Sequence, residues 1–250
     1  MRSLITIFLG LALLGPTAAA AMGPLDLSAE VGLFDRYLWR GITVSDDFVV
    51  QPELSASVGG FGLAVWANSD ADDADGTSGI DKYDVTLSYG LSLPMLSLDL
   101  GFIYYSFPEA SDANTTEAYA SASAGVLLSP SLTVYRDLDA VDGWYWEAGV
   151  NHGLTLSPAF TVDLAARLGL GSERYLAGYF PGAALVEDPA ASSLTDAMLT
   201  LSLPWHPVPM LTVTPSAGWS TLLDDAGTLT EDAGGETDAT VLGLTASVSF

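Results

Sequence analysis

The stretch K-Y-D-V-T-L-S-Y-G-L-S-L, residues 82–93, indicates the fold class of this chain. Large apolar residues alternate in it with small or polar ones from Tyr83 to Leu93. Because successive side chains of a β-strand point to opposite faces, this period of two predicts a strand with one apolar and one polar face. A water-soluble sandwich could bury the apolar face in a core, and a membrane barrel could turn it toward lipid.

The same alternation recurs along the chain and predicts twelve strands. They cover residues 25–40, 49–58, 61–68, 82–93, 96–107, 115–128, 132–137, 144–156, 160–171, 194–203, 211–220 and 239–250.

The connections between these strands separate the two alternatives. Short turns follow the even-numbered strands, at residues 59–60, 94–95, 129–131, 157–159 and 204–210. Longer loops follow the odd-numbered strands, at residues 41–48, 69–81, 108–114, 138–143, 172–193 and 221–238. Strict alternation of this kind is typical of transmembrane barrels. We therefore predict an all-β, up-and-down antiparallel barrel of twelve strands, with long loops outside the cell and short turns in the periplasm.

Both ends of the chain favour the outer membrane of a Gram-negative bacterium. Residues 1–21 have a basic start, an apolar run and a small-residue tract, which predicts a signal peptide cleaved near residues 19–21 and a barrel domain over 22–250. The apolar run is too short for the roughly twenty residues of a membrane helix. The ending T-V-L-G-L-T-A-S-V-S-F, residues 240–250, resembles the last strand of outer-membrane barrels, whose terminal aromatic is associated with the barrel-assembly machinery.

Composition narrows the classes of partner. The chain has 7 basic and 31 acidic residues, which argues against nucleic acid as a partner. Its mean hydropathy is nevertheless positive, which suits an apolar lipid-facing band with acidic residues in loops and lumen. We expect outer-membrane lipid, lipopolysaccharide, the assembly machinery and small solutes as partners. There is no cysteine, so no disulfide forms and the signal is not that of a lipoprotein.

Aromatic residues cluster where the predicted strands meet the long loops. This placement favours a belt at the membrane interface, although aromatics are common in β-sheets generally. The residues concerned are Tyr37, Trp39, Tyr104, Tyr105, Tyr119, Tyr135, Trp144, Trp146 and Trp219.

One segment resembles a known family. The motifs are R-Y-L-W-R-G-I-T-V-S-D-D (residues 36–47), the Gln51-Pro52 step and G-L-A-V-W-A-N-S-D (residues 62–70). They are similar to the opening of the TorF-type porin family of outer-membrane barrels, over residues 31–70. The resemblance implies a barrel with a porin role, and it supplies neither a substrate nor a catalytic residue.

No motif for covalent chemistry emerges. The chain has two histidines, His152 and His206, and neither lies in a pattern that would activate a serine or hold zinc. The acidic loop over residues 70–76 invites a calcium interpretation, but its spacing does not fit an EF-hand. We expect solvated charge there, with weak bridging of divalent ions to lipopolysaccharide left open. The sequence thus predicts no enzyme, no cofactor and no dedicated metal site.

Charged residues on the predicted polar faces are candidates to line the lumen, because an arginine facing lipid near mid-membrane costs roughly 2 to 4 kcal/mol. These lumen candidates are Arg36, Arg40, Glu53, Trp66, Asp99, Asp163 and Arg167.

The register of the first three strands follows from their turns. A two-residue turn at residues 59–60 places Glu53 opposite Trp66. If the first hairpin pairs Trp39 with the second strand on the lipid side, Arg36 falls opposite Glu53 in the lumen.

The sequence leaves three candidate functions open. A passive channel would select small solutes by the size and charge of its lumen. Twelve strands make a narrow barrel that side chains can close, so a structural or surface-interaction barrel, with acidic loops that bind ions or envelope components, is the alternative. An outer-membrane enzyme is the third. Conductance in planar bilayers discriminates between the first two.

Overall fold

The computed structural model describes residues 24–70, 79–180 and 192–250. The predicted signal peptide and most of the acidic loop over residues 70–76 lie outside these ranges. Within them, no helix is long and apolar enough to cross a membrane.

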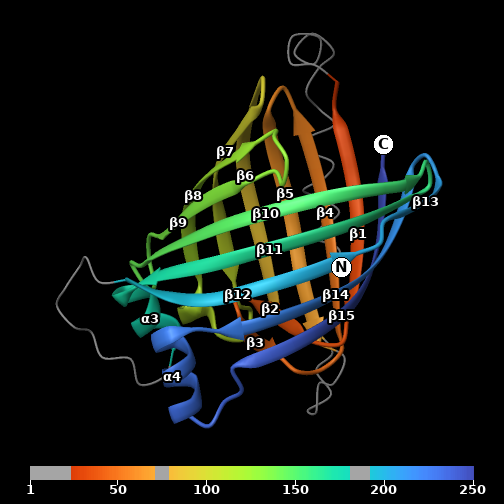
Figure 1. Cartoon of the computed structure of the whole chain (residues 1–250). Helices are drawn as coiled ribbons and strands as arrows, with labels where there is room; N and C mark the ends of the chain where they lie inside the picture. Colours follow the sequence, from red (N-terminus) through yellow and green to blue (C-terminus); the bar gives the residue numbers. More distant parts are fainter. Residues whose placement is uncertain (1–23, 71–78, 181–191) are drawn as a thin grey trace.

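Twelve antiparallel strands form a closed barrel, as the alternating sequence predicts (Figure 1). Strands that are neighbours in the barrel pair in sequence order, and the first strand pairs with the last, which closes the sheet. The barrel strands are β1 (Asp26–Phe34), β4 (Val49–Val58), β5 (Phe61–Asp70), β6 (Lys82–Leu93), β7 (Leu96–Ser106), β8 (Thr115–Ala124), β9 (Ser131–Asp137), β10 (Trp144–Ser157), β11 (Phe160–Ser172), β12 (Ser192–Ser202), β14 (Leu211–Leu222) and β15 (Asp238–Ser249).

The remaining elements distinguish the two ends of the barrel. The loop end carries the hairpin of β2 (Tyr37–Trp39) and β3 (Ile42–Ser45), the 3-10 turn η1 (Ser111–Ala113) and the helices α3 (Glu173–Tyr179) and α4 (Asp224–Asp232). The turn end carries the short connections, β13 (Trp205–Val208) and the C-terminus. Figure 1 shows α3 and α4 at one end of the barrel and β13 with the C-terminus at the other.

Residue alternation gives the wall two chemically different faces. Large apolar side chains such as Leu87, Leu100 and Leu199 are more than half exposed on the outer face. Their sequence neighbours Ser88, Gly101 and Thr200 therefore face inward. The pattern matches a wall with an apolar exterior and a polar lumen.

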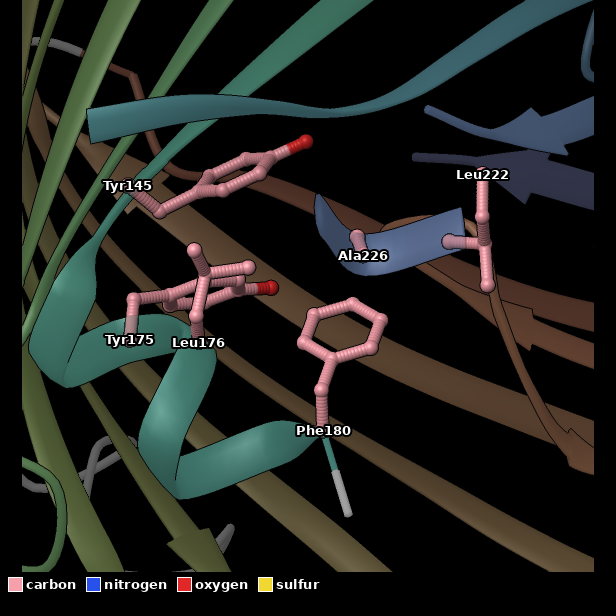
Figure 2. Packing of buried hydrophobic residues seen from close by; sticks show 6 residues of the cluster. All are labelled: Tyr145, Tyr175, Leu176, Phe180, Leu222 and Ala226. Atoms are coloured by element: carbon pink, nitrogen blue, oxygen red, sulfur yellow. The ribbon is translucent and has the colours of Figure 1, made fainter. Parts of the chain in front are cut away.

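Buried side chains gather at the loop end. Figure 2 shows Tyr175 and Leu176 on α3 packed beside Tyr145 of the wall, with Phe180 pointing toward Ala226 of α4 and Leu222. This cluster holds the two helices over the barrel end.

The first strand is shorter than predicted, and the predicted register of its hairpin is wrong. The prediction ran to residue 40, whereas β1 ends at Phe34, where the Leu242 backbone N–H donates to the Asp35 carboxylate at 2.8 Å. Glu53 therefore lies opposite Glu30, not opposite Arg36. The alternating residues after Phe34 continue as β2, which pairs only with β3.

The aromatic belt is only partly as predicted. Tyr104, Trp144 and Trp219 are exposed on the outer face, and Trp146 stacks on Trp144 with ring centroids 6.1 Å apart. The other predicted members point inward instead, because each lies at an inward register position or on the hairpin. They are Tyr37, Trp39, Tyr105, Tyr119 and Tyr135.

Candidate functional site

The β2–β3 hairpin folds into the loop end of the barrel, and we call it, together with α3, the mouth plug. Arg40 lies at the tip of the hairpin with a φ of 48°, followed by Gly41 with a φ of 82°. This left-handed pair reverses the chain, and glycine supplies the second position without steric cost. The turn directs the Arg40 side chain to the far wall of the barrel.

Arg40 forms a buried, bidentate ion pair with Glu117 of β8. Its two terminal nitrogens donate to Glu117 Oε1 at 2.8 Å and to Glu117 Oε2 at 2.7 Å. The two side chains are 6% and 2% exposed. Tyr105 Oη donates to the same carboxylate at 2.7 Å. Paired charges in this geometry satisfy each other, whereas either one alone would be strongly destabilising.

Aromatic rings surround the Arg40 guanidinium. Its central carbon lies 4.6 Å from the Trp39 ring centroid, 4.3 Å from that of Tyr135 and 4.4 Å from that of Tyr145. Ring faces attract cations within about 6 Å. Burial alone lowers the pKa of Arg40, but the Glu117 carboxylate more than offsets this and raises the pKa well above its ordinary value. Arg40 therefore stays charged and fixed in the mouth.

Helix α3 completes the plug from the opposite side. Ser172 caps it by accepting the Tyr175 backbone N–H at 3.3 Å. The Tyr175 ring lies 5.1 Å from the Tyr145 ring. A Cβ atom at Gly171 would come within 2.6 Å of the Tyr175 ring, so the glycine permits this close approach. The Tyr179 ring lies 4.9 Å from that of Trp39, which joins helix and hairpin.

A second buried cation lies beside the first. Lys82 Nζ donates to Asp84 Oδ2 at 3.0 Å and to Tyr37 Oη at 3.1 Å, and the lysine side chain is 8% exposed. The rings of Tyr105 and Trp66 lie 4.7 and 5.2 Å from its nitrogen. Each of these two cations is thus paired with a carboxylate.

Below the plug, toward the turn end, the lumen is lined mainly by small residues. Register places these side chains inward next to one another on four successive strands: Ser55 and Ser57, Gly62 and Ala64, Thr86 and Ser88, and Gly101. A cavity of about 640 Å³ lies against this part of the wall. Small, polar side chains leave room for solvent there.

Five carboxylates on the inward faces of this lower lumen form no salt bridge among the described residues. They are Asp26, Glu30, Glu53, Asp99 and Asp163. Arg167 is the cation at this level, and it lies 3.4 Å from Glu147. The lower lumen is therefore acidic.

The structure separates the lumen candidates into three groups. Arg40 lies in the plug, and Arg36 lies beside the hairpin, away from Glu53. Glu53 and Trp66 are opposite each other, as predicted, and the Trp66 ring contacts Tyr37. The remaining three candidates lie on inward faces of the lower lumen. Asp99 accepts from Tyr119 Oη, Asp163 lies opposite Gly153, and Arg167 donates to Glu147.

Sequence reasoning missed two buried charged residues of the mouth, Glu117 and Lys82. Glu117 alternates with Tyr119 at the start of β8, which is an inward position once the apolar outer face is assigned. Lys82 is the only lysine of the chain and begins a strand of strict alternation. Their pairing with residues of the hairpin could not be found, because the sequence does not indicate that the hairpin enters the barrel.

Comparison with known proteins gives a family and a fold. The sequence profile of one family, described as "Bacterial protein of unknown function (Gcw_chp)", matches residues 18–161. No curated protein matches the chain. The TorF-type resemblance of residues 31–70 stays a prediction.

Three solved structures are similar over most of the chain. The KdgM porin has a TM-score of 0.53 at 14% identity, covering 90% of this chain and 99% of its own. The NanC porin has a TM-score of 0.51 at 12% identity, covering 89% and 98%. The COG4313 outer membrane channel from Pseudomonas putida F1 has a TM-score of 0.53 at 14% identity, covering 95% and 100%. At these identities the likeness shows the fold, which is that of outer-membrane porins and channels.

Proposed function

The chain belongs to the bacterial Gcw_chp family of unknown function, and from this membership and its porin-like barrel we propose that it is an outer-membrane channel for passive diffusion of small solutes. The observation that carries the proposal is the lining of the lower lumen. A barrel with a purely structural role can fill its interior with large side chains, as small barrels do. This wall instead carries Ser, Gly, Ala and Thr on adjacent inward positions.

We further propose that the barrel lies in the outer membrane with its apolar outer face in contact with lipid. Its loop end faces the cell exterior and its turn end faces the periplasm. Solutes cross without covalent chemistry, because a channel needs only a lined path.

The acidic lumen favours cations. Unpaired carboxylates at a narrow part of a channel raise the local concentration of positive ions and repel negative ones. Glu30 and Glu53 lie opposite each other on adjacent strands, so both contribute at the same level of the lumen. We therefore assign small cationic or neutral solutes to this channel.

One observation favours the closed structural barrel as the second candidate. The Arg40 side chain, on the hairpin, contacts Glu117, Tyr135 and Tyr145 of three successive wall strands, so it ties the hairpin across the mouth. If this plug never moves, the barrel is a closed wall whose loops meet ions or envelope components.

Replacement of the hairpin tests the channel against the closed barrel. Phe34 and Val49 are register partners, so a short Gly/Ser linker in place of residues 35–48 can bridge the two strands. In planar bilayers we expect rare, brief openings from the natural chain and steady conductance from the linker variant. The variant Asp46→Asn/Asp47→Asn alters only exposed residues between β3 and β4 and should behave as the natural chain.

The same recordings can contradict the proposal. A linker variant that folds, shown by retained β-structure and heat-modifiable mobility on gels, and yet stays silent would favour the closed barrel.

A further inference from the structure

A separate pocket opens at the loop end, beside the plug. Its volume is about 400 Å³, within the range of small-molecule sites. The pocket is lined by the hairpin, by the wall strands β6, β7 and β8, by the loop after β9 and by α3. The binding of a ligand there does not depend on conduction through the barrel.

The walls of this pocket are aromatic. The aromatic residues that line it are Tyr37 and Trp39 of the hairpin, Tyr105 of β7, Phe107 just after β7, and Tyr179 of α3. The Trp39 ring stands edge-on to Tyr179 at 4.9 Å and to Tyr105 at 6.4 Å. Such surfaces bind flat apolar rings by stacking and edge-to-face contact.

Lys82 supplies a charged donor to the pocket lining. An ammonium group has three N–H donors, and Lys82 uses two of them, to Asp84 and Tyr37. The third has no hydrogen-bond acceptor among the described residues. A ligand oxygen placed at Lys82 would accept this hydrogen bond.

The local charges select against charged ligands. Lys82 is paired with Asp84, and Arg40 is paired with Glu117. The Asp137 carboxylate beside Thr115 already accepts one side-chain and three backbone hydrogen bonds, so no charged group there is left to pair with a charged ligand. An anion or a cation would therefore lose its hydration without gaining a free partner of opposite charge. A neutral ligand avoids this cost.

The scarcity of other polar groups argues against sugars. Thr115 Oγ1 already donates to Asp137 Oδ2 and Tyr105 Oη to Glu117 Oε2, each at 2.7 Å. Apart from Lys82 and the hydroxyl groups of Tyr37 and Tyr179, the remaining lining is mostly apolar. A polyhydroxyl ring would leave several hydroxyl groups without partners, at a cost for each. We infer that this pocket binds small neutral aromatic molecules that carry one hydroxyl or carbonyl oxygen, with the ring among the aromatic walls and the oxygen at Lys82.

Benzyl alcohol is a suitable probe, with benzoate and methyl glucoside as charged and polyhydroxyl comparisons. Binding to the purified full chain in detergent can be followed by ligand-observed NMR. We expect saturable binding of benzyl alcohol, with weaker binding of both comparisons. Lys82→Met should weaken the affinity about tenfold, since it removes one hydrogen bond to a charged donor. Arg167→Met makes the same kind of change in the lower lumen and should leave the affinity unchanged.

A pocket-filling variant covers the case in which Lys82→Met does not fold. Ala113→Trp, at an exposed position of η1 on the pocket rim, should abolish saturable binding and also corrects for uptake into micelles. Equal binding by the natural chain and Ala113→Trp would overturn the site. Tighter binding of benzoate or methyl glucoside than of benzyl alcohol would overturn the ligand class.

Discussion

At the scale of single residues, the Arg40 side chain anchors the mouth plug to the barrel wall. It is the one cation that the hairpin delivers into the barrel, and both its terminal nitrogens end on Glu117. Neither residue can be replaced alone without leaving a buried charge, because each side chain is almost fully enclosed. The pair therefore holds the plug in one position.

We predict that Arg40→Met lowers the free energy of unfolding by about 3 to 5 kcal/mol, the usual effect of leaving one member of a buried ion pair alone. Adding Glu117→Gln should recover part of this loss, because the unpaired charge is gone. Urea unfolding in lipid vesicles measures both effects.

Arg174→Met is the matched control. Arg174 pairs with Asp142 at 2.9 Å, but the two side chains are 62% and 48% exposed, so the loss should stay below about 1 kcal/mol. Equal effects of the two arginine substitutions would show that Arg40 does not hold the plug.

The two predicted register partners of Glu53 differ in how far the sequence determines them. Glu53 opposite Trp66 could be predicted, because a two-residue turn fixes the register of the hairpin that contains them. Arg36 opposite Glu53 could not, because the prediction assumed a long first strand, and β1 ends at Phe34. The error is six residues, since Glu30 occupies the predicted place of Arg36.

At the scale of elements, the alternation of apolar and polar residues identified every strand of the barrel but did not identify the β2–β3 hairpin. Residues 37–40 continue the apolar alternation of β1, so the sequence predicts them as the end of a longer strand, with a loop over residues 41–48. The same rhythm suits a two-stranded hairpin with aromatic residues on its faces. Whether such a segment faces lipid or turns into the lumen depends on partners such as Glu117 and Tyr179, which are distant in sequence.

The placement of long and short connections predicts the orientation of the barrel. The chain has no cysteine, so Glu236→Cys at the loop end and Leu127→Cys at the turn end each introduce a single exposed thiol. We expect a bulky, membrane-impermeant maleimide to label Glu236→Cys on intact cells, and Leu127→Cys only after lysis. The reverse pattern would invert the topology, and labelling of neither after lysis would show that the residues are not accessible as described.

At the scale of the whole molecule, the charge distribution predicts ion selectivity. The open linker variant should pass cations better than anions, because the lower lumen carries five unpaired carboxylates. Glu53→Gln/Asp99→Asn in that background should lower the ratio of potassium to chloride permeability by a factor of about two or more. Reversal potentials across a potassium chloride gradient give this ratio.

A charge-matched control separates lumen from surface. Asp225→Asn/Glu231→Gln removes the same number of charges from the exposed side of α4 and should leave the reversal potential nearly unchanged. If both double variants shift it equally, the selectivity arises outside the lumen.

The seam between β1 and β15 has a consequence for how the molecule is made. Ser28 lies opposite Ser249, so the first strand obtains its second partner only when the last strand exists. Until then β1 and β14 present free backbone edges, which are templates for aggregation. Such distant pairing is intrinsically slow, because the entropy of closing the chain is lost before the contacts form. A chain that is still attached to the ribosome therefore cannot complete this fold. A chain truncated before β15 would remain an open sheet, and a chaperone would have to keep its free edges from pairing with those of other copies.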